Sequence, residues 1–391
     1  MPKPTHDIPT KGSSDFTIVA ESDIGYSANK NMLGVQALIA EKSPRFVLAP
    51  GDLAYGDQDG PSAINSHFND MMLWSQDAAY MAIWGNHDWE VLTTNGQPVL
   101  NEFEGRFTLP NAQTVAGAET APGHQSNDDW YWFDYGNVRF IAYPEPYTNA
   151  TWADWSSKAK LLMDTAQTDN NITFIVSFGH RPAYSSGHHP GDSALKTILD
   201  HLGATHNKYV LNINGHSHDY ERSFPQQGVV HLTVGTGGRS LETDGSCLWL
   251  SCTQPDWSDF RILQHGYTEL HFTKTAITGA FICGPTESDK NDTTCNTGQV
   301  TDSFSILPKP TTDSLACIFN YIEAKYPQYY APANNKLLVY GSNSYRYYTA
   351  TDSLLAYSPT DDHLYGGYSY SGKYYYFDGG PLTAWKSTAG C

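Results

Sequence analysis

The sequence predicts an α/β protein that carries a smaller β-rich unit at its C-terminal end. In the first three hundred residues, short β-branched runs alternate with helical segments, which is typical of layered α/β folds. The segment Leu307–Asp313 then places two prolines among polar residues, as linkers do. Beyond it the composition changes, because residues 314–391 hold 15 of the 26 tyrosines. We therefore expect one large domain over 14–306 and a small Tyr-rich domain over 314–391.

Composition and charge exclude several classes of protein. Of the 391 residues, 40% are apolar and 13% aromatic, which excludes a largely disordered chain. The 41 acidic and 23 basic residues give a net charge of −18, which argues against a nucleic-acid partner. No run of 18 consecutive apolar residues occurs, so we expect no transmembrane segment.

Each predicted element of the first unit follows from a local pattern. Apolar, β-branched runs predict strands over 16–20, 45–49, 80–84, 138–142, 172–176, 209–213 and 229–234. Helical periodicity predicts helices over 31–42, around 159–163 and over 193–202. From these patterns alone we expect a sheet whose two faces are covered by helices.

Five of these strands are followed directly by side chains that can bind a metal. Because ligands bind at the carboxyl ends of strands in α/β sheets, these side chains are expected to converge. They are Asp23, Asp52 with Tyr55, Asn86, His180, and His216 with His218. Seven donors are too many for one tetrahedral site and suit two cations that share a carboxylate. The glycines beside four of them are expected to allow tight turns.

Each of these side chains has an ordinary structural explanation when it is taken alone. A single histidine is more often structural, Asp-Gly and Asn-Gly pairs usually mark turns, and Asp23 is placed to cap a helix. Five such strand ends in succession favour the metal site.

The five motifs together resemble the calcineurin-like metallophosphoesterase superfamily, and within it the purple acid phosphatases. They are Ser22-Asp23-Ile24-Gly25, Gly51-Asp52-Leu53-Ala54-Tyr55, Gly85-Asn86-His87-Asp88, Ser177-Phe178-Gly179-His180 and Gly215-His216-Ser217-His218. The resemblance covers about 14–306, and its two departures, Ser22 and Ser177, lie outside the ligand positions. It implies a four-layer αββα metallophosphoesterase sandwich.

The resemblance also implies roles for the seven donors. Asp23, Asp52, Tyr55 and His218 would hold a ferric ion, since a phenolate favours Fe(III). Asp52 would bridge to a divalent Fe, Zn or Mn ion, which Asn86, His180 and His216 would complete.

Three further histidines are implied to act in catalysis. His87 matches a position that binds phosphate and stabilises the transition state. His188 and His189 lie where plant members carry a histidine pair that binds phosphate or protonates the leaving group, and His189 is favoured. The alternative for this pair is an ordinary surface loop. Arg181 is a weaker candidate for phosphate binding, and Arg222 is expected to form a structural ion pair.

Three functions are compatible with these residues. The preferred one is an acid phosphatase that hydrolyses small phosphate monoesters with a metal-bound hydroxide. The second is a phosphodiesterase of the same superfamily, acting on cyclic nucleotides or organic diesters. The third is a secreted surface-binding protein in which the tail is active and the metal domain vestigial.

The cysteines and tyrosines of the last third leave alternatives open. Six cysteines predict the pairs 247–252, 283–295 and 317–391, and with them a secreted or periplasmic protein. The alternative is a zinc site built by the first four thiols. The tyrosines of the tail are expected either to form the core of a small domain, after a helix over 314–325, or to bind glycans or a partner.

Overall fold

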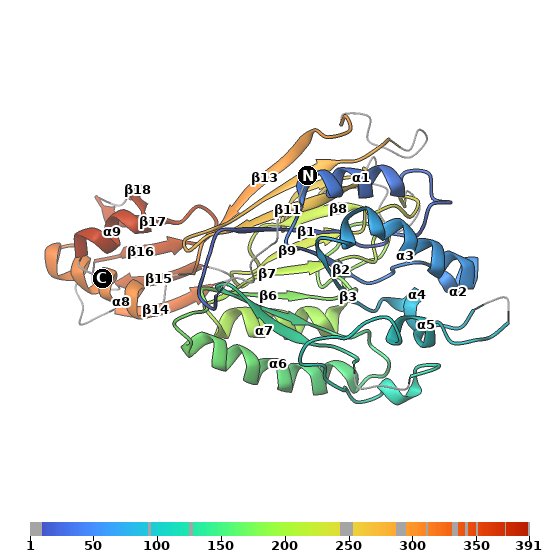
Figure 1. Ribbon diagram of the computed structural model, residues 1–391. Coiled ribbons are helices and arrows are strands. Elements are labelled where there is room, and N and C mark those ends of the chain that lie inside the picture. The colour runs from blue at the N-terminus through green and yellow to red at the C-terminus, as the bar shows by residue number, and fades with distance from the viewer. Residues whose placement is uncertain are drawn as a thin grey trace.

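The computed structural model describes residues 10–92, 95–124, 128–242, 253–286, 295–309, 312–330, 335–340, 343–348, 351–371 and 373–389. Figure 1 shows a large body of two sheets flanked by helices, and a smaller sheet with two helices at its side. None of the described helices is long and apolar enough to cross a bilayer.

The first sheet of the large body has six strands. Their spatial order is β13 (Val300–Ile306), β12 (Ile277–Cys283), β11 (Gly266–Phe272), β1 (Phe16–Ala20), β2 (Phe46–Pro50) and β3 (Ala79–Ile83). Strands β1, β2 and β3 are parallel, whereas β11 runs antiparallel to β1 and begins an antiparallel meander. The carboxyl ends of the three parallel strands therefore share one edge.

The second sheet has seven strands. Their order is β10 (Ser258–Ile262), β8 (Tyr220–Ser223), β9 (Val230–Val234), β7 (Tyr209–Asn214), β6 (Phe174–Phe178), β5 (Val138–Ala142) and β4 (Trp132–Tyr135). Strands β5, β6, β7 and β9 are parallel, and their side chains are buried along almost their whole length. Such continuous burial is what a sheet covered on both faces requires.

Aromatic contacts join the two sheets into one core. Phe46 on β2 packs edge to face against Phe140 on β5, with ring centroids 5.5 Å apart. At the other side, Tyr220 on β8 stacks on Phe281 on β12 at 4.3 Å. The strand patterns alone suggested one sheet covered by helices, and that expectation is wrong, because the predicted strands divide between two facing sheets.

Helices close both outer faces of the pair. Helices α1 (Met32–Lys42) and α3 (Pro61–Ser75) flank the first sheet, and α6 (Thr151–Thr168) and α7 (Ser193–Thr205) flank the second (Figure 1). The shorter helices are α2 (Gly56–Asp59), α4 (Asn86–Trp89), α5 (Leu100–Glu104) and the 3₁₀ turn η1 (Ala118–Thr120). The four-layer αββα sandwich is thus confirmed.

The tail forms a sheet and core of its own. Helix α8 (Thr312–Lys325) leads into an antiparallel meander of β14 (Asn335–Tyr340), β15 (Asn343–Tyr348), β16 (Ser353–Ser358), β17 (His363–Tyr370) and β18 (Lys373–Pro381), followed by α9 (Leu382–Ala389). Its buried cluster includes Ile318 and Phe319 of α8 with Tyr348, Leu355 and Leu364 of the sheet. The predicted helix and β-rich tail are therefore present, whereas α9 was not expected.

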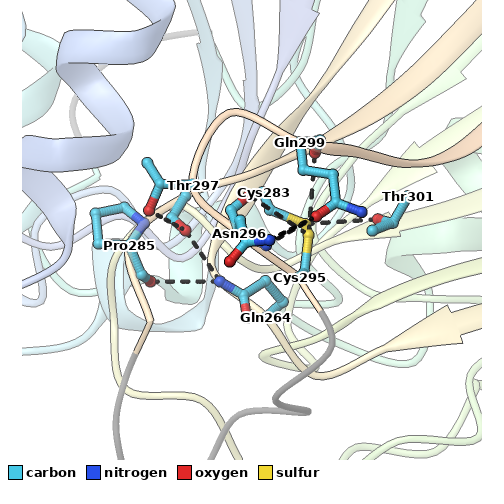
Figure 2. The surroundings of a disulfide bond; sticks show 9 residues. Gln264, Cys283, Pro285, Cys295, Asn296, Thr297, Gln299 and Thr301 are labelled. Atoms are coloured by element: carbon cyan, nitrogen blue, oxygen red, sulfur yellow. Dashed lines mark hydrogen bonds between the residues drawn. A yellow bond between two sulfur atoms is a disulfide. The ribbon is translucent and has the colours of Figure 1, made fainter.

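One expected disulfide lies wholly within the described residues. Cys283 at the end of β12 forms a disulfide with Cys295. Figure 2 shows the hydrogen bonds that polar side chains form around this disulfide. This bond uses two of the four thiols that the alternative zinc site required. Cys317 is also disulfide-bonded, while its expected partner Cys391 and the pair Cys247–Cys252 lie outside the described residues.

Candidate metal centre

The structure brings the seven predicted donors together where the two sheets meet. Asp23, Asp52, Tyr55 and Asn86 follow β1, β2 and β3 of the first sheet. The three histidines follow β6 and β7 of the second sheet. All seven side chains come from the segments that directly follow parallel strands, so the carboxyl edges of both sheets build a single site.

Three of the donors form a first group around the Tyr55 hydroxyl. This oxygen lies 3.1 Å from Asp23 Oδ1 and 2.9 Å from His218 Nε2, and those two atoms are 3.3 Å apart. Donors that share a cation at about 2.1 Å lie about 3 Å from one another. A phenol, a carboxylate and an imidazole are thus spaced as ligands of one ion.

The other four donors form a second group around His180. Its Nε2 atom lies 3.1 Å from Asp52 Oδ2 and 3.2 Å from Asn86 Oδ1. Donor atoms of Asp52, His180 and His216 all lie within 4.8 Å of one another. His180 is fixed through its other nitrogen, because its Nδ1–H group donates a hydrogen bond to the Pro50 carbonyl oxygen at 2.9 Å. Such outer bonds orient metal-binding imidazoles.

Four of the seven donors have left-handed backbone conformations. The φ angles are 55° at Asp23, 50° at Asp52, 55° at Tyr55 and 71° at His216. Residues other than glycine adopt this region at a cost of about 1–2 kcal/mol each. The strain lies at the loops that aim the donors inward, and the surrounding buried structure holds it in place.

The neighbouring glycines serve close approach more than turning. Gly51 alone among the four has a positive φ, of 88°. A Cβ on Gly85 would lie 2.2 Å from Asp52 Oδ1, and one on Gly215 would lie 2.5 Å from Asp23 Oδ2. Glycine is needed at these two positions because the donors lie against the backbone.

The carboxylates and imidazoles of the site stabilise one another's charged forms. Burial opposes ionisation of Asp52, but the imidazoles of His180, His87 and His216 hold the pKa of its carboxyl below the ordinary value. Burial also opposes the charged form of His218, which lowers its pKa. The nearby Asp23 carboxylate outweighs this effect and raises the pKa of His218 to about 9. The carboxylates thus attract positive charge to the site, as a cation-binding site must.

His87 is held by two carboxylates beside this group. Its Nδ1 lies 2.8 Å from Asp57 Oδ2, and its backbone N–H donates to Asp52 Oδ1 at 2.9 Å. Burial alone would lower the pKa of His87, but the hydrogen bond to Asp57 and the charge of Asp52 raise it. The imidazole is therefore disposed to carry a proton next to the donors.

His189 lies closer to the donors than His188. Its ring stacks on His216 with centroids 4.0 Å apart, and its Nε2 is 3.5 Å from Glu242 Oε1. His188 packs against His189 and lies 3.9 Å from the same carboxylate oxygen. Glu242 thus gathers the histidine pair at the rim of the site.

The loop after β9, residues 235–242, supports the site and was not predicted. Backbone N–H groups of Gly237 and Arg239 bond on either side of Asp23, to the carbonyls of Ser22 and Asp23. The Arg239 guanidinium lies 4.3 Å from the centre of the Tyr55 ring and is paired with Asp59 at 2.8 Å. The Gly-Thr-Gly-Gly run before Arg239 was the available sequence signal.

Two arginines that the sequence singled out have ion-pair partners. The Nε–H group of Arg181 donates to both carboxylate oxygens of the buried Glu145. Another nitrogen of the same guanidinium donates to His216 Nε2 at 2.7 Å. Arg222 pairs with Asp302 and Asp259, as its structural role predicted. Arg181 therefore supports a predicted donor as well as bordering the site.

A polar cavity of about 330 Å³ opens over the donors. Its lining includes Asp52 and Tyr55 at the floor with His87, His189 and Arg239 around them. This volume lies at the lower end of small-molecule sites, and its wall combines the His87 and Arg239 side chains with the Glu242 carboxylate.

The chain belongs to the calcineurin-like phosphoesterase family, since residues 16–220, more than half of its length, match the model of that family. Residues 228–303 match a second model, described as iron/zinc purple acid phosphatase-like protein C. The family predicted from the five motifs is thus confirmed.

A solved structure shares the fold of this chain, and curated relatives are similar to part of its sequence. A purple acid phosphatase, PPD1 from yellow lupin seeds, superposes with a TM-score of 0.60 at 21% identity, over 76% of this chain and 55% of that one. The probable inactive purple acid phosphatase 9 of Arabidopsis thaliana is 25% identical over 204 residues, 46% of this chain and 30% of that protein. Acid phosphatase type 7 of Danio rerio is 22% identical over 267 residues, 57% of this chain and 55% of that protein. The chain thus spans between about a third and just over half of these curated relatives.

Proposed function

We propose that the protein hydrolyses phosphate monoesters at a dinuclear metal centre. The observation that carries this proposal is the pair of donor groups described above, one around Tyr55 and one around His180, with Asp52 beside the second. The seven intact donors argue against a vestigial site, since loss of activity normally removes ligands.

The donor chemistry fits one ferric and one divalent ion. Asp23, Tyr55 and His218, with Asp52 as the bridge, would hold Fe(III), because a phenol and carboxylates are hard donors. Asn86, His180 and His216, again with Asp52, would hold a divalent Fe, Zn or Mn ion. When bound, such a pair supplies Lewis acidity that activates water and neutralises phosphate charge.

The remaining residues would bind the ester and handle its protons. The cavity brings His87 and His189 to the open side of the donors, where a phosphate group would lie. His87, with its raised pKa, would donate hydrogen bonds to the phosphate oxygens and offset the charge that develops on them. His189, beside Glu242, is placed to give a proton to the departing alkoxide.

Metal analysis with a visible spectrum tests the centre directly. The isolated protein is expected to hold two metal ions, one of them ferric, and to show a tyrosinate-to-iron charge-transfer band. Tyr55→Phe should remove the band, and Asp52→Ala should lose metal together with activity. A colourless protein that is fully active with two zinc ions would contradict the ferric assignment.

Turnover of two aryl phosphates separates the preferred substrate class from its alternative. We expect kcat/KM for a mono-aryl phosphate to exceed that for the bis-aryl phosphate at the same site. A preference for the diester would instead identify a phosphodiesterase. Loss of both activities in Asp52→Ala ties either result to this centre.

We also propose that the protein acts in a secreted or periplasmic setting. The disulfide between Cys283 and Cys295 supports this, because such bonds persist in oxidising compartments. Fractionation of the native host, with the protein found only in cytosol, would contradict the proposal.

A further inference from the structure

The sheet of the tail has two unlike faces. Helices α8 and α9 cover one of them, where Leu315 and Ile322 of α8 and Leu382 of α9 join the buried cluster. Successive side chains of a strand point to opposite faces, so the neighbours of the buried Tyr348, Leu355 and Leu364 lie on the other face. We call that second surface the open face.

The open face is built mainly of tyrosine. Strand register places Tyr347, Leu354, Gly367 and Tyr376 in one row across β15, β16, β17 and β18. Tyr345, Ala356, Tyr365 and Asp378 form the next row, and Tyr374 lies two residues before Tyr376. In the first row Leu354 and Gly367 therefore lie between two tyrosines. Tyr376 is 76% exposed, the highest value among the exposed large hydrophobic side chains.

Several of these rings are held in place. The Tyr347 hydroxyl donates to Asp352 at 2.5 Å, and the Tyr365 hydroxyl donates to Asp361. The rings of Tyr374 and Tyr376, with centroids 4.8 Å apart, lean over Gly367. A Cβ at Gly367 would lie 2.7 Å from the first ring and 3.3 Å from the second. Fixed rings lose little conformational entropy when a ligand stacks on them.

The charge of the open face selects among partners. Asp352, Asp361 and Asp378 are exposed there, and Asp378 is paired with His363 at 2.9 Å. Exposed carboxylates repel polyanions such as nucleic acids and acidic polysaccharides. Leu354 and Ala356 are the aliphatic residues on this face of the described strands β15 to β18, so it offers little of the apolar surface that buried protein interfaces use.

We propose that the open face binds a neutral polysaccharide. The C–H faces of pyranose rings stack on exposed aromatic rings, and sugar hydroxyls bond to the carboxylates and phenols around them. The row from Tyr347 to Tyr376 crosses four of the five strands and would contact several sugar units of one chain. Binding here would hold the phosphatase on an insoluble surface, and it is independent of the reaction at the metal centre.

Retention of the full chain on insoluble polysaccharides tests this proposal. Microcrystalline cellulose, chitin and granular starch serve as neutral probes, and alginate gel serves as the polyanion. We expect retention on at least one neutral probe and none on alginate. Tyr374→Ala/Tyr376→Ala should weaken that binding about tenfold or more, because each ring contributes a stacking contact.

Phe377→Ala is the matched control. Phe377 is also exposed, at 45%, and follows Tyr376 in β18, but its side chain belongs to the opposite face. Binding of this variant should stay within about twofold of wild type. Single Tyr376→Ala, which removes a mostly exposed ring, keeps the test valid if the double variant does not fold. Retention on none of the neutral probes, equal loss in Phe377→Ala, or preferential binding to alginate would overturn the proposal.

Discussion

Tyr55 and Tyr376 place the same side chain in two regions of the molecule with opposite exposure. Tyr55 is 1% exposed, and its pKa is raised well above the ordinary value by burial and then by the Asp23 and Asp52 carboxylates. Its phenol therefore stays protonated unless a cation replaces the proton. Tyr376 is 76% exposed, and its ring lies 4.8 Å from that of Tyr374. Under the two proposals above, burial, more than residue type, would decide whether a phenol acts as a ligand or as a stacking surface.

The largest effect is expected where polar groups are buried beside the donors. His87→Ala should lower kcat about a hundredfold with both metals retained, because it removes a charge stabiliser from the phosphate site. Asp57→Asn should have a smaller effect in the same direction, since it weakens only the bond that orients His87. Steady-state kinetics and metal content are the measurements.

Tyr376→Ala is the control from the other region, with turnover expected to match wild type. If His87→Ala lost metal in proportion to activity, His87 would be a ligand, and the separation of donors from catalytic residues would be wrong.

A stability effect of intermediate size is expected at Glu21, which lies directly after β1 and two residues before Asp23. Burial raises the pKa of this carboxyl to about 8, although a hydrogen bond from Gln36 opposes the shift. Folded protein then keeps a proton that unfolded protein releases near pH 4.5, so stability falls as pH rises from about 4.5 to 8. The maximal slope for one such group is about 1.4 kcal/mol per pH unit.

Glu21→Gln keeps the shape without the titration. The free energy of unfolding is measured in denaturant between pH 5 and 8 for this variant and for wild type. The difference between the two should increase in favour of the variant as pH rises. Parallel curves would show that the carboxyl is not protonated in the folded state.

The smallest effect is expected from removal of the tail. We propose that residues 14–306 are a functional unit, so a chain truncated after Lys309 should keep its metals and hydrolyse an aryl phosphate within about twofold of the full rate. The cut spares Lys309 because its ammonium donates to the carbonyls of Gly203 and Gln227 at 2.7 and 3.1 Å. A soluble, fully metallated product with most turnover lost would make the tail part of the active site.

Much of the site was predictable because its donors follow strands in short motifs. The spacing from Asp52 to Tyr55 and from His216 to His218 is local information, and the short apolar runs before them locate the strands. The division of the strands into two sheets could not be predicted from local sequence patterns. Strands β1 and β6 have the same buried, β-branched pattern, and only their long-range pairing assigns them to different sheets.

The supporting residues were harder to predict for the same reason. Arg239 reaches Asp59 across 180 positions, and Glu242 meets His189 from another loop. Nothing in the neighbourhood of either residue in the sequence indicates these partners. The open face of the tail is an intermediate case, since alternation divides the tyrosines into two sets, but only the packing of α8 and α9 shows which set is covered.

The left-handed backbone at Asp23, Asp52, Tyr55 and His216 has a consequence for evolutionary drift. At each position glycine would relieve about 1–2 kcal/mol of backbone strain. That gain is outweighed where the side chain fills buried space, because Tyr55 is 1% exposed and truncation of a buried aromatic side chain costs about 3–5 kcal/mol. Drift to glycine at Tyr55 should therefore lower the melting temperature, so packing would preserve this phenol even in a lineage with no need for its chemistry.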